Sequence, residues 1–474
     1  MAGITSSIPS GLEWRSSTAF IIATVAIGMF TDLFLYGLVV PILPFILGDR
    51  IHVPPSEVQY DTSLLLASYA GAQVLFSMVA GYIADRLPSR QPPFLFGLAA
   101  LFASTAMLFG GKSVPVLIVA RLLQGMSASV VWTIGLALIM DTVGTAKLGV
   151  TIGSIFSMIS VGELVAPPLG GVVYKKGGSI AVFGIGVGLL GVDFIMRLLV
   201  IEKKTAAAYG LIIEGEEEED GEASETSPLL SNGKTKEEEL KMWIVPKSQP
   251  AWIRSLPILY CLGNTRLWVS QLVTFTQATL LAVFDSTIVI EAQALFGFDS
   301  LKAGLIFIPQ ILPCLVVGPL AGRAVDRYGA RPIATLGLVF LSIPLVLLRI
   351  PHSGGAAEIA KMSAILSLSG IGISMISAPS IVEASYVVEQ YHAANEDFFG
   401  KQGPYGQLYA MSSIAFSAGL TVGPVAAGAL RNSIGYGNMN AVMAGFCACV
   451  SVLAWRYLGT IPKKVDNTSA ASEM

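Results

Sequence analysis

Twelve long apolar segments constrain the fold of this 474-residue chain more than any other feature. At about 20 residues each, they have the length of an α-helix that crosses ~30 Å of hydrocarbon. Lipid offers no partner for free backbone N–H and C=O groups, so segments of this length must be helices. The expected spans cover residues 18–46, 62–84, 93–111, 114–140, 148–173, 179–200, 267–292, 302–323, 332–350, 360–386, 404–430 and 438–458.

The composition supports an all-α membrane protein. Hydrophobic residues make up 53% of the chain and charged residues only 13%, whereas about a quarter of the residues in a soluble domain are charged. The basic residues are spread among short loops, so no nucleic-acid surface is expected. The four cysteines have neither disulfide nor metal-ligand spacing, and we expect no metal and no cofactor.

Between residues 202 and 266 the hydropathy falls sharply. Residues 214–240 are mostly acidic and small polar, so they cannot bury enough apolar area to fold. The sequence therefore divides into five expected parts. These are a cytoplasmic N-terminal tail (1–17), an N-terminal six-helix bundle (18–201), a disordered acidic cytoplasmic linker (202–266), a C-terminal six-helix bundle (267–459) and a cytoplasmic C-terminal tail (460–474).

The positive charges set the expected orientation. An even number of spans places both termini on one side, and the excess of Lys and Arg on that side favours the cytoplasm. Residues 1–17 lack the features of a secretory signal, so the first span is expected to act as an uncleaved anchor. ETSPLL (225–230) fits an acidic dileucine sorting pattern. The plasma membrane and a vacuolar or vesicular membrane both remain open as locations.

Two motifs recur in the two halves. Residues 81–90 (GYIADRLPSR) and 322–331 (GRAVDRYGAR) both follow the second apolar segment of their half and both read G-x-x-x-D-R-x-x-x-R. Residues 162–171 (GELVAPPLGG) and 419–428 (GLTVGPVAAG) share a Gly–Pro–Gly spacing in spans five and eleven. Repeats of this kind indicate one duplicated six-helix unit.

These motifs resemble those of the major facilitator superfamily. The resemblance covers nearly the whole chain apart from the linker, and its strongest segments are 31–47, 81–90, 120–143, 162–174 and 275–290. More narrowly, the chain resembles the twelve-span drug:proton antiporter group, including fungal multidrug and metabolite transporters, and the vesicular amine transporter branch. The resemblance implies two pseudo-symmetric six-helix bundles that rock about a central cavity, which gives alternating access.

In the family, the repeated loop forms a cytoplasmic gate. The resemblance implies that Asp85 lies near a helix N-terminus of the other half, where a carboxylate is stabilised, and that Arg86 and Arg90 pair with acids at helix ends. The alternative is a pair of charged loops that only fix topology. The expected gate residues are Gly81, Asp85, Arg86, Arg90, Gly322, Asp326, Arg327 and Arg331.

Glycine and proline in spans five and eleven permit close helix approach and a bend. The family links this pattern with antiport, although tight packing alone needs the same residues. The expected bend residues are Gly162, Pro167, Pro168, Gly171, Gly423 and Pro424.

Acids inside the spans are the candidates for coupling to protons or substrate. Asp32 in span one and Asp285 in span seven occupy related positions, and the resemblance aligns Asp32 with an acid that amine transporters use. Removing a carboxylate from water favours its neutral form, so such a group can exchange protons. The alternative is a hydrogen-bonded structural acid.

Further charges lie in other spans. Arg121 and Glu163 have comparable expected depths, so a buried pair and a proton relay are both open. Glu383 in span ten is a further candidate for coupling, as a gating acid, and an interface role is the alternative. Asp193 and Arg197 are spaced i, i+4, which favours a pair within one helix.

Two positions limit the substrate prediction. The lysine and the acid that the resemblance leads us to expect are replaced by Tyr69 and Ser413, so a neutral or weakly charged organic molecule is indicated. The expected cavity aromatics are Phe34, Tyr36, Tyr69, Trp132, Tyr405 and Tyr409.

The sequence predicts a monomeric proton-coupled transporter that exports or sequesters a small organic molecule, drug or secondary metabolite. Its expected partners are that substrate, protons and the lipid bilayer. A proton symporter for nutrient uptake and a non-transporting membrane sensor are the alternatives on the same fold. No P-loop or nucleophile motif indicates an enzyme.

Overall fold

The computed structural model describes residues 10–39, 42–43, 46–87, 89–207, 209, 243–245, 250, 253, 256–298, 302, 305–400 and 403–459. The expected tails beyond these residues, the sorting pattern at 225–230 and most of the acidic linker lie outside the described part of the chain. Within it the regular structure is helical, as the apolar segments predict.

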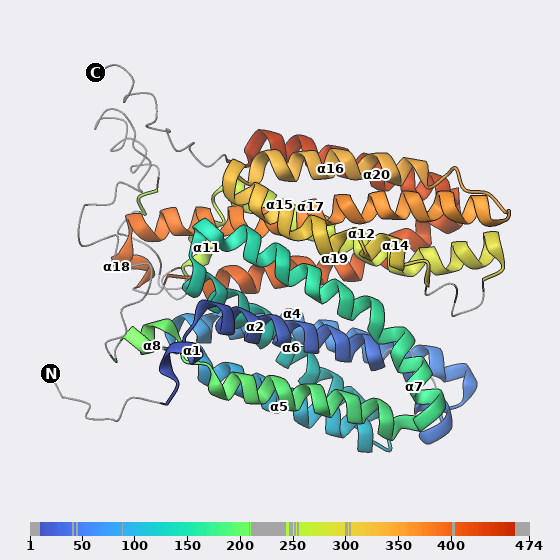
Figure 1. The fold of residues 1–474 in the computed structure, drawn as a ribbon, viewed down its shortest axis with the longest axis horizontal. Helices are drawn as coiled ribbons and strands as arrows, with labels where there is room; N and C mark the ends of the chain where they lie inside the picture. Colours follow the sequence, from blue (N-terminus) through green and yellow to red (C-terminus); the bar gives the residue numbers. More distant parts are fainter. Residues whose placement is uncertain are drawn as a thin grey trace.

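Five long helices form the N-terminal bundle (Figure 1). They are α2 (Thr18–Val39), α4 (Pro55–Arg86), α5 (Gln91–Gly110), α6 (Val114–Val143) and α7 (Leu148–Leu199). The last of these contains two spans, because the backbone at Gly178 is not helical, with φ 64° and ψ −165°. Positive φ suits glycine, which has no Cβ, and in Figure 1 the chain reverses direction within α7.

The C-terminal bundle supplies the other six spans. Its helices are α12 (Thr265–Phe296), α14 (Ile308–Ile311) with α15 (Cys314–Tyr328), α16 (Ala330–Leu347), α17 (Ala356–Ala394), α19 (Tyr405–Ile434) and α20 (Tyr436–Tyr457). Eleven helical segments of the described chain are long and apolar enough to cross a membrane. Since one of them holds two spans, the predicted twelve-helix fold is confirmed.

The bounds of several helices differ from those of the expected spans. The described helix of the first span covers Thr18–Val39, whereas the expected span reaches residue 46. Other helices are longer than expected, and α17 extends to Ala394. The expected linker also carries two short helices, α8 (Lys203–Ala207) and α11 (Ile258–Cys261).

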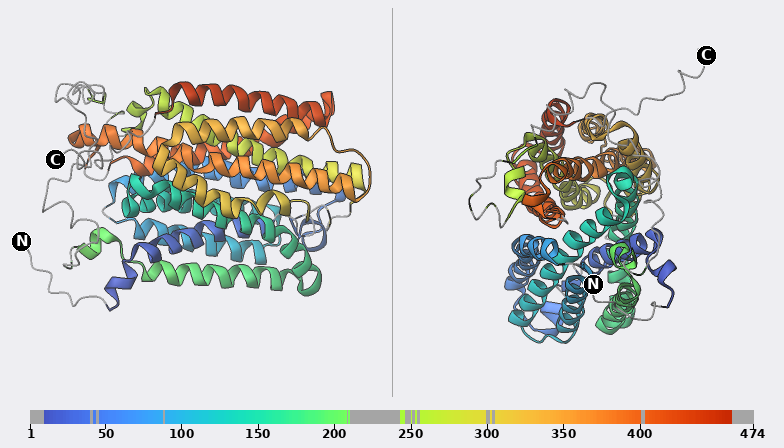
Figure 2. Two further views of the ribbon diagram at one scale, coloured as in Figure 1. Left: turned by 45° about the horizontal axis from the view of Figure 1, so that its top comes forward. Right: turned by 90° about the vertical axis from the view of Figure 1, so that its left-hand side faces the viewer.

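The bundles pack with the same pairing in each half. In the N-terminal bundle α2 packs on α7 and α5 on α6, and the equivalent pairs in the C-terminal bundle are α12 on α19 and α16 on α17. Between the bundles, α4 packs on α19 and α7 on α15, which are again equivalent pairs. Figure 2 shows the two groups of helices side by side, one coloured blue to green and the other yellow to red.

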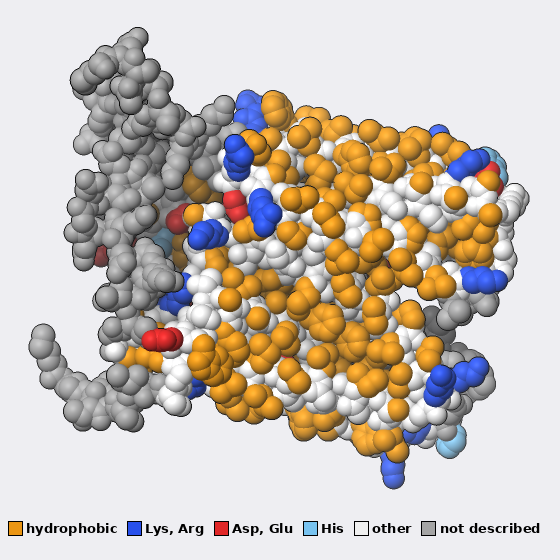
Figure 3. Space-filling model, in the orientation of Figure 1, with side chains coloured by type: hydrophobic (Ala, Val, Ile, Leu, Met, Phe, Trp, Pro, Cys, Tyr) orange, Lys and Arg blue, Asp and Glu red, His pale blue; other side chains and the backbone are white. Residues whose placement is uncertain are grey.

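The molecule has two distinct ends. One end carries α1 (Leu12–Arg15), α8, α11 and α18 (Glu396–Phe399), and we call it the terminal end (Figure 1). The opposite end, which carries the turn at Gly178, is called the loop end. Charged side chains gather near these two ends, whereas hydrophobic atoms cover the surface between them (Figure 3). Apolar side chains within spans, such as Leu75 on α4 and Val425 on α19, are 73% and 72% exposed, which fits a surface in contact with lipid.

Candidate functional site

A cavity lies between the two bundles. Its volume is about 460 Å³ when the space that opens to solvent is included. The N-terminal bundle contributes Leu33, Trp132, Gly153, Phe156, Ser157, Ile159, Ser160 and Glu163 to its lining, and the C-terminal bundle contributes Gln277, Leu281, Cys314, Gly318, Ile373, Ser374, Ser377 and Phe416. An apolar and aromatic wall with a few polar groups is typical of a site for a small organic ligand.

One carboxyl group lines this cavity, and a second one from the opposite bundle lies near it. The side chains of Glu163 on α7 and Asp285 on α12 are solvent-exposed, although both lie deep within membrane-spanning helices. They also interact with one another electrostatically. Water that reaches both groups must enter between the bundles, since lipid surrounds their outer faces. Glu163 therefore lines the cavity, and Asp285 of the opposite bundle lies close enough to interact with it.

Asp32 lies directly behind the cavity wall. Its side chain is 1% exposed, and its Oδ2 accepts hydrogen bonds from Trp132 Nε1 at 3.1 Å and from the Tyr69 hydroxyl at 3.3 Å. The Trp132 ring in turn stacks on Phe416 of the other bundle, with ring centroids 6.3 Å apart. Asp32 is thus linked to the cavity through one indole ring.

The expected pair of Arg121 and Glu163 does not form. Arg121 is fully buried on α6, and its Nη1 donates to Gln124 Oε1 at 2.8 Å. Its guanidinium carbon lies 5.8 Å from the centre of the Tyr36 ring. Arg121 turns towards Tyr36, whereas Glu163 lines the cavity.

The six aromatic residues expected in the cavity have different places. Trp132 lines it. Phe34 stacks on Phe30 at 5.4 Å, and Tyr36 packs on Tyr69 at 4.9 Å, all within the N-terminal bundle. The prediction that all six line the cavity is wrong for the described lining.

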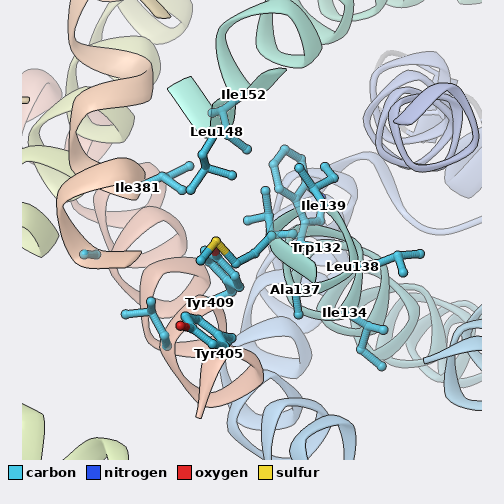
Figure 4. Packing of buried hydrophobic residues seen from close by; sticks show 14 of the residues in the cluster. Trp132, Ile134, Ala137, Leu138, Ile139, Leu148, Ile152, Ile381, Tyr405 and Tyr409 are labelled. Carbon is cyan, nitrogen blue, oxygen red and sulfur yellow. The ribbon is translucent and has the colours of Figure 1, made fainter. Parts of the chain in front are cut away.

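Tyr405 and Tyr409 instead belong to the buried core at the terminal side of the cavity. They are 7% and 1% exposed, and the Tyr409 hydroxyl is hydrogen-bonded to the Ser385 hydroxyl at 2.8 Å. Figure 4 shows both rings near Trp132 and beside apolar residues of α6, α7 and α17. This core joins the two bundles and closes the cavity towards the terminal end.

The first repeated loop joins the bundles at the terminal end. The two Asp85 carboxylate oxygens accept hydrogen bonds from the backbone N–H groups of Gly406 at 2.6 Å and Gln407 at 2.9 Å. These are the second and third residues of α19, where the helix dipole favours a negative charge. A Cβ on Gly81 would lie 2.5 Å from the carbonyl oxygen of Gly406, so the two helices touch backbone to backbone.

Arg90 holds the Asp85 carboxylate from the N-terminal side. Its guanidinium lies 3.5 Å from Asp85 and 3.1 Å from Asp141. Burial opposes its charged form, but the attraction of the two acids outweighs burial and raises the pKa of Arg90 above its usual value. The arginine therefore stays charged.

The second repeated loop makes the equivalent contact. Asp326 accepts hydrogen bonds from the backbone N–H groups of Gly149 at 2.7 Å and Val150 at 2.9 Å, at the start of α7. A Cβ on Gly322 would collide with the Gly149 carbonyl oxygen. We call the two contacts the Asp85 latch and the Asp326 latch.

The other expected gate arginines do not pair with acids in the described structure. The guanidinium carbon of Arg86 lies 4.5 Å from the centre of the Tyr82 ring, that of Arg327 lies 5.3 Å from Tyr328, and that of Arg331 lies 4.4 Å from Trp455. Each stacks on an aromatic ring near the terminal end, and the expectation of acid partners for Arg86 is wrong.

The glycine and proline motif serves close packing. A Cβ on Gly162 would lie 2.7 Å from the Phe30 ring of α2, and one on Gly423 would lie 2.6 Å from the Thr279 carbonyl oxygen of α12. Helix α7 continues through Pro167 and Pro168, and α19 continues through Pro424. Gly171 makes no such approach, because a Cβ there would meet open space.

Glu383 is held in the C-terminal bundle. Its Oε1 accepts hydrogen bonds from Arg266 Nε at 2.7 Å and from the Gly459 backbone at 2.8 Å. These contacts join α17 to the start of α12 and to the residues after α20. The geometry favours a structural role for Glu383 over the coupling role expected from the sequence.

Several lining residues were not singled out from the sequence. Phe156, Gln277 and Phe416 lie on three different helices and carry no motif of their own. Two of them lay close to predicted site residues in the sequence: Phe156 precedes Glu163 on α7, and Gln277 lies in the segment TFTQATLLAVFD of α12, which ends at Asp285. The described chain contains no group of three His, Cys, Asp or Glu side chains that could hold a metal ion.

Comparisons with known proteins agree with this architecture. A family model described as Major Facilitator Superfamily matches residues 25–395 and 267–473. The chain is 42% identical to the MFS-type transporter ppzB of Metarhizium rileyi, over 95% of this chain and 97% of that relative. It is 24% identical to the probable vesicular acetylcholine transporter-B of Danio rerio, over 89% of this chain and 75% of that relative.

A solved structure has the same fold. The crystal structure of the human organic anion transporter MFSD10 (TETRAN) matches 93% of this chain and 100% of that chain, with a TM-score of 0.62 and 17% sequence identity.

Proposed function

Because the chain belongs to the major facilitator superfamily, we propose that it is a proton-coupled antiporter for a small organic molecule. It carries this molecule out of the cytosol, either across the plasma membrane or into a vacuole or vesicle, by alternating access. The observation that carries the proposal is the placement of two acids from different bundles: Glu163 lines the cavity, and Asp285 is exposed and interacts with Glu163 electrostatically.

The described conformation fits one half of such a cycle. The Asp85 and Asp326 latches and the core around Tyr409 close the terminal end. Glu163 and Asp285 remain exposed beyond that closure. With the terminal end in the cytoplasm, as the positive charges indicate, this is the state in which a cargo leaves and a proton enters.

The cavity also suggests the kind of cargo. Trp132, Phe156 and Phe416 offer aromatic faces, and Ser157, Ser374 and Gln277 offer hydrogen bonds. The two carboxyl groups would repel an anion and attract a cation, and aromatic rings bind cations through their faces. A neutral or cationic organic compound, such as a drug or secondary metabolite, is the expected substrate.

Transport into proteoliposomes tests the proposal. Radiolabelled tetraphenylphosphonium, cycloheximide and salicylate serve as cationic, neutral and anionic probes, together with any library compound that raises the melting temperature of the purified protein. Antiport predicts accumulation of a neutral or cationic compound in acidic vesicles, against its own gradient. Accumulation that runs in the same direction as the protons would indicate a symporter. Stabilisation by a ligand without any flux would indicate a sensor.

A further inference from the structure

A second set of ionisable side chains lies inside the N-terminal bundle, apart from the cavity. Asp193 and Arg197 lie on the second span of α7 and are 0% and 1% exposed. A charged side chain is costly to bury within a membrane span. Charges buried at that cost within a span are functional candidates until a structural role accounts for them.

Both side chains reach the same point of α2. A methyl group on Gly28 would lie 3.3 Å from Arg197 Nη2 and 3.4 Å from Asp193 Oδ1. Gly28 precedes Asp32 by one helical turn, and Asp193 interacts electrostatically with Asp32. The Asp193 carboxyl group therefore lies on the side of the bundle that leads to Asp32.

The simple pair within one helix, which the i, i+4 spacing favours, does not form. Neither carboxylate oxygen of Asp193 has a hydrogen-bond partner in the described chain, and neither do Nε and Nη1 of Arg197. Nη2 of Arg197 donates to the Thr24 carbonyl at 3.4 Å, and the guanidinium carbon lies 3.2 Å from the centre of the Phe94 ring. The two side chains attract each other electrostatically without a hydrogen bond between them.

The row of ionisable groups continues to the terminal end. The Arg197 carbonyl accepts a hydrogen bond from Gln91 Nε2 at 3.3 Å. The Gln91 backbone N–H donates to Glu202 Oε1 at 2.9 Å, and Ser89 donates to the same oxygen at 2.7 Å. Arg197 and Glu202 also interact electrostatically. Asp32, Asp193, Arg197 and Glu202 thus follow one another from the middle of the bundle to its edge.

We propose that this row is the proton route between Asp32 and the terminal end, with Asp193 as the relay and Arg197 as the barrier against leak. The proposal rests on the proposed function as a proton-coupled carrier. The proton leaves the Asp32 carboxyl group and joins the Asp193 carboxylate through internal water, and no electron is transferred. Buried polar atoms without a protein partner are the usual places for such water.

The charges around Asp193 suit this exchange. Helix α2 contributes Asp32, α7 contributes Arg197, and α5 contributes the uncharged Phe94 ring. The Arg197 guanidinium interacts electrostatically with both Asp193 and Glu202, and a fixed positive charge repels a free proton. A proton therefore passes Arg197 only when it can bind to the Asp193 carboxylate. On this route it does not cross the cavity that holds the cargo.

A leak measurement tests the route and needs no cargo. The purified full chain is reconstituted in liposomes that contain pyranine, and a potassium gradient with valinomycin drives protons inward. We expect wild-type vesicles to be nearly impermeable to protons and vesicles with Arg197→Gln to acidify at least tenfold faster. Arg197→Lys keeps the charge and should stay tight. The double variant Asp193→Asn with Arg197→Gln should return to the wild-type rate, because the relay is gone.

Two results would overturn the proposal. If vesicles with folded Arg197→Gln are as tight as wild type, Arg197 is no barrier. If the double variant leaks as fast as Arg197→Gln, the leak follows a packing defect and not Asp193.

Should Arg197→Gln fail to fold, infrared titration of the wild type and Asp193→Asn decides instead. A relay predicts one carboxyl C=O band that titrates in the wild type and is missing in the variant, and identical titrations would refute the route. Antiport itself is judged separately from wild-type cargo uptake, so either idea can fail without the other.

Discussion

Asp85 and Asp326 hold equivalent positions in the two bundles, since each carboxylate accepts hydrogen bonds from N–H groups in the first turn of a helix in the opposite bundle, the shorter ones at 2.6 and 2.7 Å. The two latches close the same end of the molecule, where α4 meets α19 and α15 meets α7. A carrier that alternates must break both of them together.

Removing either carboxylate charge should favour opening of the terminal end. For Asp85→Asn or Asp326→Asn we expect a loss of about 1 kcal/mol for the closed state, which is roughly a fivefold change in population. Spin labels on the exposed residues Ala146 and Glu396, which lie at that end on opposite bundles, should report longer distances. Asp397→Asn, an exposed acid at the same end, is the control, and an equal effect there would count against the latches.

Adding one methyl group between the bundles should also favour opening of the terminal end. Gly322→Ala forces a Cβ against the Gly149 carbonyl oxygen, and overpacking costs about 1–3 kcal/mol. The same pair of spin labels should show opening, while the melting temperature of the protein changes little. Gly171→Ala, whose Cβ would meet open space, should leave the distances unchanged. If the distance between the spin labels in Gly322→Ala stays as short as in the wild type, the closed state does not need this close contact between the helices.

Asp32→Asn should separate exchange from coupled transport. The amide keeps the contacts to Trp132 and Tyr69 but cannot give up a proton, so uptake driven by a pH gradient should fall more than tenfold. Counterflow of cargo at equal pH should persist. Tyr69→Phe, which removes the longer of the two hydrogen bonds (3.3 Å), should have a milder effect. Full gradient-driven uptake by Asp32→Asn would remove Asp32 from the mechanism.

Glu163→Gln and Asp285→Asn should weaken the binding of a cationic cargo more than that of a neutral one. Each substitution replaces an acidic group that lines the cavity (Glu163) or lies near it (Asp285) by an uncharged amide. A binding titration with tetraphenylphosphonium and cycloheximide compares the two cargo types. Equal losses for both would point to altered packing of the cavity wall.

Glu383→Gln should act on stability and leave coupling intact. The carboxylate holds Arg266 and the Gly459 backbone at 2.7 and 2.8 Å, and hydrogen bonds to charged groups contribute about 1.5–3 kcal/mol. Thermal unfolding should therefore occur at a lower temperature, with the ratio of protons to cargo unchanged. Glu358→Gln, in a surface pair with Lys361, should leave the unfolding temperature unchanged. A changed ratio in Glu383→Gln would restore the coupling role.

The sequence predicted the architecture because apolar length and repeated motifs are properties of the chain itself. The twelve spans and the equivalence of 81–90 with 322–331 can be recognised from the sequence alone. The direction in which a side chain leaves its helix was harder to predict. Residue counting gave Arg121 and Glu163 comparable depths, but it could not show that Arg121 turns to Gln124 and Tyr36.

The same limit applies to the aromatics and to the remaining acids. Tyr409 and Trp132 are both large aromatics in membrane helices, yet one packs in the core at the terminal side and the other lines the cavity. Glu383 and Asp32 are both acids within spans, but only Glu383 has an arginine at 2.7 Å. Such differences depend on which helix lies opposite, and that is set by tertiary packing.

The reversal at Gly178 also bears on how the protein can be visualised. The chain passes from one span to the next within α7, with a single residue outside the helical conformation, so this hairpin offers no slack for a fiducial domain. The exposed segment 352–355 joins α16 to α17 outside both helices, and exposed loop tips tolerate insertions best. A rigid fusion partner or an antibody epitope for electron cryomicroscopy belongs there.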